Sequence, residues 1–141
     1  MKISMSKTLL LVCCAWLMGL VSGCGGGGGQ KIDVQAQLQN LKSDNAESRQ
    51  NACVELAKGG EAAAAAVQPL MAALKDQDAL VRRLAAYALG QIGPKASQAI
   101  PALKESLNDT DASVIQAAVN AISAIDPKAN VDAKLPPNVT N

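Results

Sequence analysis

The chain has 141 residues, enough for one small domain with tails. Its 13 basic and 12 acidic residues nearly cancel, so no basic surface is implied and nucleic acid is a poor candidate for a partner. Histidine and phenylalanine are both absent. Because the usual general base and the usual zinc ligand are missing, we expect neither an enzyme nor a metal site.

Residues 1–23 have the pattern of an export signal. Lys2 and Lys7 provide a positive start, and the 14 residues 8–21 follow without charge or proline. This run is shorter than the roughly 20 apolar residues that span a bilayer, but it fits the hydrophobic region of a secretory signal. Removal of the segment would leave 118 residues with 11 basic and 12 acidic side chains.

Residues 21–24, Val-Ser-Gly-Cys, resemble the lipobox of bacterial lipoproteins. The resemblance implies that Cys24 receives a diacylglycerol group and becomes the first residue of the mature chain. Apart from this covalent lipid we expect no cofactor. A thiolate is the soft nucleophile that thioether formation needs, and two or three acyl chains such as palmitate anchor a protein firmly. The alternative is an ordinary secretory signal with a cysteine near its end by chance.

Five consecutive glycines lie within residues 24–33. Glycine has low helix and strand propensity, so we expect a flexible tether between the lipid and a folded body. In enterobacterial lipoproteins an Asp at the position of Gly25 is typical of proteins retained in the inner membrane. Glycine at this position therefore favours a location in the outer membrane. The sequence thus predicts a lipid-anchored protein of the bacterial cell envelope, with an unknown envelope protein as partner.

An internal repeat with a spacing of 33 residues follows the tether. The equivalent apolar positions are Val34, Val67 and Ile100; Leu41, Leu74 and Leu107; Ala52, Ala85 and Ala118; and Leu56, Leu89 and Ile122. The predicted copies span 34–60, 67–97 and 100–127 within a domain of residues 34–127. One copy cannot bury its own apolar face, so the copies are expected to stack.

Each copy is predicted to form two helices. In the second copy, apolar residues recur at helical spacing in two runs: Val67, Leu70, Met71 and Leu74, then Val81, Ala85, Ala88, Leu89 and Ile92. A turn at residues 75–78 separates the runs, and Gly93 with Pro94 ends the second helix. Residues 128–141 contain little that is apolar and are expected to form a disordered tail.

Residues 78–93, DALVRRLAAYALGQIG, strongly resemble a HEAT repeat of the type named after phycobilin lyases. The first copy departs from the motif at Ser48, where valine is usual, and the third at Ile115, where arginine is usual. The resemblance implies an all-α fold, a short right-handed α-solenoid of about three HEAT-type helical hairpins.

In this family the motif arginine usually bridges to an aspartate in a turn between helices. By this resemblance, Arg82 pairs with Asp76 or Asp78, and Arg49 pairs with Asp44. We interpret all five residues as structural.

The second helices line the concave face of HEAT solenoids, and a polar stripe on them is the predicted partner-binding surface. Its members are Arg83, Tyr87 and Gln91; Gln50 and Lys58; and Gln116 and Asn120. Tyrosine and arginine are enriched at protein-binding hot spots. The alternative is a plain solvated face.

Cys53 has the register of Ala86 and Val119, which favours a small buried thiol over a redox or attachment site. The predicted function is a non-catalytic protein-interaction module on a lipid anchor. Because some HEAT-repeat proteins of this type are bilin lyases or their relatives, an accessory or lyase-like subunit that binds a tetrapyrrole chromophore is the alternative.

Overall fold

The computed structural model describes residues 32–129, which form helices and turns without a strand. The predicted signal, Cys24, most of the tether and residues 130–141 of the tail lie outside this range. The α-helices are α2 (Val34–Asn40), α3 (Ala46–Gly59), α4 (Val67–Ala73), α5 (Ala79–Ile92), α6 (Ile100–Ser106) and α7 (Ala112–Ile125). Two 3₁₀ helices, η1 (Gly60–Ala66) and η2 (Gly93–Ala99), join the hairpins.

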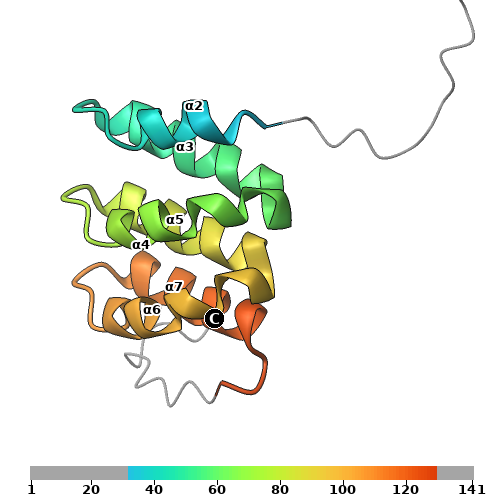
Figure 1. Ribbon diagram of the computed structural model, residues 1–141. Coiled ribbons are helices and arrows are strands. Elements are labelled where there is room, and N and C mark those ends of the chain that lie inside the picture. Colours follow the sequence, from blue (N-terminus) through green and yellow to red (C-terminus); the bar gives the residue numbers. More distant parts are fainter. Residues whose placement is uncertain (1–31, 130–141) are drawn as a thin grey trace, which may run out of the picture.

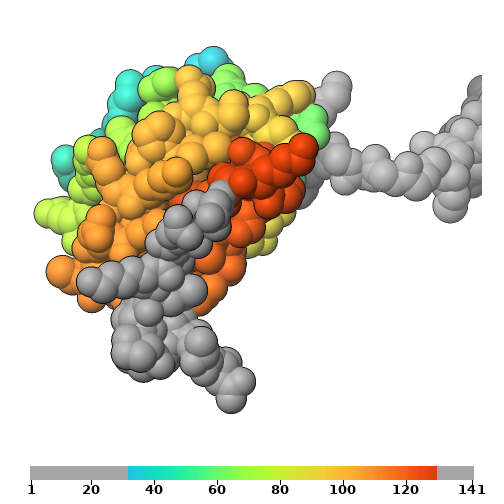
Figure 2. Space-filling view, turned by 90° about the horizontal axis from the view of Figure 1, so that it is seen from below, coloured from blue at the N-terminus to red at the C-terminus, as the bar shows by residue number. Residues whose placement is uncertain are grey.

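The helices form three hairpins, α2–α3, α4–α5 and α6–α7, stacked in chain order (Figure 1). The short first helices make one layer and the 14-residue second helices make the other. Turns inside the hairpins gather at one edge of the stack, and η1 and η2 lie at the other (Figure 1). Helices α6 and α7 form one end (Figure 2). This arrangement confirms the predicted all-α solenoid.

Each second helix begins at an aspartate or asparagine whose side chain caps it. Asn45, Asp78 and Asp111 accept hydrogen bonds from backbone N–H groups in the first turn of α3, α5 and α7. Gly60 and Gly93 end α3 and α5 with φ of 50° and 68°, values that a side chain would disfavour. The 33-residue spacing of Asn45, Asp78 and Asp111 therefore fixes where each second helix begins.

The core lies between the two helix layers and is built from leucines and many alanines. Leu56, Leu70 and Leu89 are fully buried, as are the equivalent alanines Ala52, Ala85 and Ala118. Small side chains let the second helices approach closely. At Gly90 of α5 a Cβ atom would lie 3.1 Å from the Cα of Ala121 on α7. In the described range, no helix is both long and apolar enough to cross a bilayer.

Candidate interaction groove

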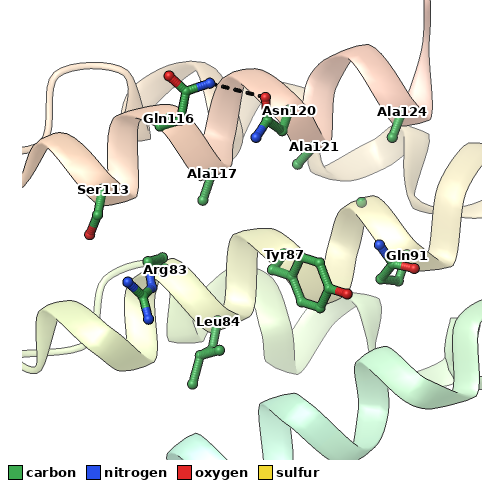
Figure 3. A pocket seen from close by; sticks show the side chains of 11 residues that line it. Arg83, Leu84, Tyr87, Gln91, Ser113, Gln116, Ala117, Asn120, Ala121 and Ala124 are labelled. Carbon is green, nitrogen blue, oxygen red and sulfur yellow. Dashed lines mark hydrogen bonds between the residues drawn. The ribbon is translucent and has the colours of Figure 1, made fainter. Parts of the chain in front are cut away.

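A groove of about 530 Å³ lies between α5 and α7 (Figure 3). Its size is typical of binding pockets in proteins. Helix α5 contributes Arg83, Leu84, Tyr87, Gly90 and Gln91, and α7 contributes Ser113, Gln116, Ala117, Asn120, Ala121 and Ala124. The two helices thus supply a short concave surface rather than a closed cavity.

The middle of the groove is apolar, and small residues line it. Gly90 packs against Ala121, which brings the two helices close together there. Ala117 and Ala124 point from α7 toward α5 (Figure 3). Tyr87 is 52% exposed, so the ring offers a large surface that no described residue covers fully. This part of the groove suits an apolar side chain.

The polar groups of the groove are one cation and several neutral side chains. Gln116 Nε2 donates a hydrogen bond to Asn120 Oδ1 over 3.0 Å along α7 (Figure 3). Arg83 is exposed, and it is the charged residue among those that line the groove. Within residues 32–129 no carboxylate lies within 4.0 Å of its guanidinium.

A second charged feature, the Arg–Asp ladder, consists of Arg49 with Asp76 and Arg82 with Asp109. Arg49 Nε and Nη2 lie 2.7 and 2.9 Å from the two carboxylate oxygens of Asp76. Arg82 repeats this geometry on Asp109 with the same two distances. The partner follows 27 residues later in both pairs, so each pair joins one hairpin to the next.

The HEAT repeat family matches residues 34–126, which is most of the chain. The chain belongs to the HEAT repeat family. A comparison with curated proteins finds no match. HEAT repeats are helical modules that typically mediate protein interaction without catalysis. The described part of this HEAT chain holds no group of three or more Cys, Asp or Glu side chains placed to bind a metal ion.

The predicted partners of the motif arginines were wrong. Arg82 was expected to pair with the side chain of Asp76 or Asp78, and Arg49 with that of Asp44. The turn of the same hairpin supplies only backbone carbonyls: Arg49 Nη1 donates to Ser43 and Asp44, and Arg82 Nη1 to Asp76 and Gln77. Because those carbonyls hold one edge of the guanidinium, its other edge faces the carboxylate of the next hairpin.

Asp78 accepts hydrogen bonds from two groups other than the motif arginine. Its Oδ1 accepts the N–H of Val81 over 2.9 Å, which caps α5. The same oxygen accepts from Nε2 of Gln50 over 3.2 Å. Asp78 is therefore structural, but through the start of the helix rather than through the motif arginine.

The ladder shifts the pKa of its carboxylates. The hydrogen bond from Arg82 lowers the pKa of Asp109, against the opposing effect of burial. For Asp76, burial alone would raise the pKa, but hydrogen bonds from Arg49 and the N–H of Asp78, with the charges of Arg49 and Arg82, lower it overall. Both aspartates are therefore ionised in the folded HEAT array at neutral pH.

The predicted polar stripe divides between two environments. Five of its seven residues, Arg83, Tyr87, Gln91, Gln116 and Asn120, line the groove. Gln50 and Lys58 of α3 are not among the lining residues. Gln50 bonds to Asp78, and Lys58 forms an exposed pair with Glu55 over 2.6 Å.

Four small residues of the groove, Gly90, Ser113, Ala117 and Ala121, were missing from the prediction. The repeat register contained a signal for one of them, because Ala117 is the equivalent of Leu84 in the preceding repeat. A change from large to small at a fixed position of the second helix indicates open space. The close contact of Gly90 with Ala121 needed the structure.

Cys53 of α3 is fully buried. Burial raises the pKa of its thiol to about 12, so almost no thiolate exists at neutral pH. The folded array therefore uses this residue as a small apolar side chain, and the attachment or redox alternative finds no support in its surroundings.

Proposed function

We propose that this HEAT chain is a lipid-anchored envelope protein that binds another protein through the groove between α5 and α7. The observation that carries the proposal is the groove itself, which combines an exposed tyrosine, an exposed arginine and an apolar middle of small residues. Tyrosine and arginine are the side chains that most often dominate binding energy at protein interfaces. No catalytic step is part of this proposal.

The anchor is proposed from the sequence of residues 21–24 and from the composition of the tether. A lipid on Cys24 would be joined to the HEAT array by residues 24–33. Ten extended residues reach at most about 35 Å, and a glycine-rich coil of that length spans about 17 Å on average. The array would then meet partners close to the membrane surface, which raises their effective concentration.

The binding proposal is tested by site-specific crosslinking in cells that express the full chain. A photo-crosslinking amino acid replaces Tyr87 in one variant and Lys104, an exposed residue of α6 on the other helix layer, in the control. We expect a discrete protein adduct from position 87 and none from position 104. The adduct should disappear when Ala124→Trp fills the groove, and an adduct that persists would contradict the proposal.

The anchor is tested by intact mass of the membrane-extracted chain, compared with Cys24→Ala. We expect a chain that starts at residue 24 and carries the added mass of acyl groups, which the variant lacks. An unacylated product cut at another position would remove the anchor from the proposal and leave the groove unaffected.

The tetrapyrrole alternative receives no specific support from the described residues. The groove offers one aromatic ring and one cation, and its apolar middle consists mainly of alanine and glycine. Visible absorption of the chain purified from its native cells would reveal a bound chromophore.

A further inference from the structure

We propose that the groove between α5 and α7 receives an acidic segment of the partner, with a carboxylate at Arg83 and a compact apolar side chain beside Tyr87. This inference rests on the proposed function and adds the chemistry of the ligand. It concerns a short peptide stretch of another protein rather than a second copy of this chain.

Arg83 differs in its surroundings from the two ladder arginines. Arg49 and Arg82 each hold an aspartate in two hydrogen bonds and are largely buried. Arg83 is one residue from Arg82, yet it is exposed and forms no ion pair within the described range. A cation without a partner at the edge of an apolar groove favours an anionic ligand, and arginine binds carboxylates in a planar two-bond geometry.

The aspartates of the turn before α7 are already engaged and leave Arg83 available. Asp109 binds Arg82, and its Oδ1 also accepts the N–H of Asp111 over 2.9 Å. Asp111 accepts the N–H and the hydroxyl of Ser113 over 2.8 and 2.6 Å. The carboxylate that would complete the site must therefore come from outside these residues.

The shape of the groove argues for a peptide. Arg83 and Gln91 are two helical turns apart, which is a distance of about 12 Å along α5. An extended peptide covers that length with about four residues. Between the two ends lie Leu84, Gly90 and Ala117, where one apolar side chain can be buried. The amide of Gln91 is placed to bond a peptide backbone at the far end.

The test uses the full chain in detergent and a display library of random 12-residue peptides. We expect enriched peptides to combine Asp or Glu with a nearby Leu, Ile, Val or Met. Binding of the best peptide should fall about tenfold with Arg83→Gln, less with Arg83→Lys, and further at high salt. Lys104→Gln removes an equal charge from α6 and should leave affinity unchanged. Ala124→Trp should abolish binding because it fills the groove.

The possible failures are distinguishable. Peptides that Ala124→Trp blocks but Arg83→Gln does not would overturn the acidic ligand and leave the groove as a binding site. Peptides indifferent to both variants, or no enrichment at all, would overturn the inference. In that case an adduct from position 87 in cells would still support the proposed function. Self-association of the chain that Arg83→Gln or Ala124→Trp abolishes would assign the groove to a second copy and overturn the inference as well.

Discussion

The two interfaces between neighbouring second helices carry side chains of different size at equivalent positions. At the α5–α7 interface, α7 presents Ser113 and Ala117, and the groove opens beside them. One repeat earlier, the equivalent residues of α5 are Leu80 and Leu84. Figure 3 shows Leu84 extending toward the α3 side. We attribute the groove to the small residues that the third repeat carries at these positions.

The Arg–Asp ladder differs from the groove because it is the same at both interfaces. One arginine of the earlier hairpin holds one aspartate of the later hairpin with matching distances. Stability in stacked repeats depends on such contacts between nearest neighbours. The ladder thus sets the register of stacking, and the residues on the exposed side of the second helices are free to vary for binding.

The largest expected effect is the protection of Cys53, the buried thiol of α3. Its raised pKa of about 12 and its burial should slow alkylation at pH 8 by about a thousandfold relative to the unfolded chain. The measurement is the rate of iodoacetamide labelling of the full chain, with the modified peptide identified by mass. Urea above the unfolding transition provides the fully reactive reference.

A matched variant extends this measurement to the second repeat. Ala86 is the equivalent of Cys53 and is also fully buried, on α5. In a chain with Cys53→Ala and Ala86→Cys, the new thiol should be protected to a similar degree. A thiol at position 86 that reacts far faster than one at position 53 would show that the groove side opens independently of the rest.

The next largest effect concerns the ladder. Asp109→Asn leaves Arg82 without its carboxylate and should lower the free energy of unfolding by about 1–3 kcal/mol. Asp76→Asn should act in the same direction at the α3–α5 interface. Urea unfolding followed by circular dichroism measures both. Asp44→Asn is the control, because only the backbone carbonyl of Asp44 contacts an arginine, and it should change stability little.

The pairing of arginine with aspartate between neighbouring hairpins could have been predicted from the sequence, whereas the size of the groove could not. The ladder aspartates have Ser43 as their equivalent in the first repeat, and the ladder arginines have Ile115 in the third. Arginine is present only where a following repeat supplies aspartate, a pattern that pairing inside one repeat does not explain. The period and the caps sufficed for the helices because both are local, but Asp109 meets Arg82 only through the stacking of two hairpins.

In the candidate site, too, the sequence predicted local features but not the packing between helices. Helical spacing was enough to place Arg83, Tyr87 and Gln91 on one stripe, and they do line one groove. The same reasoning included Lys58, which lies on α3 and pairs with Glu55 instead. Helical spacing predicts which side chains share one face of a helix. The distance between two helices depends instead on how they pack, as at Gly90.

The pH dependence of stability tests the ladder without a mutation. The folded-state pKa of Asp109 is lowered chiefly by the hydrogen bond from Arg82. The stabilisation is therefore fully present above the ordinary aspartate pKa of about 3.9 and is lost as the pH falls through the lower folded-state value. The urea midpoint should be nearly flat from pH 7 to pH 5 and then decline. Asp109→Asn should show a shallower decline, and an identical decline would remove Asp109 as a cause.

The smallest expected effect on stability comes from making the α5–α7 interface resemble the α3–α5 interface. Ala117→Leu gives α7 the residue that α5 carries at position 84, and it should fill the groove next to Tyr87. Because Ala117 is only half-buried, the added apolar contact should stabilise the fold by at most about 1 kcal/mol, less the entropy of ordering the side chain. Peptide binding should be lost although the fold is retained. The reciprocal Leu84→Ala should destabilise the chain without removing the Arg83 site. If Ala117→Leu left binding intact, the difference in side-chain size between the two interfaces would not be what creates the site.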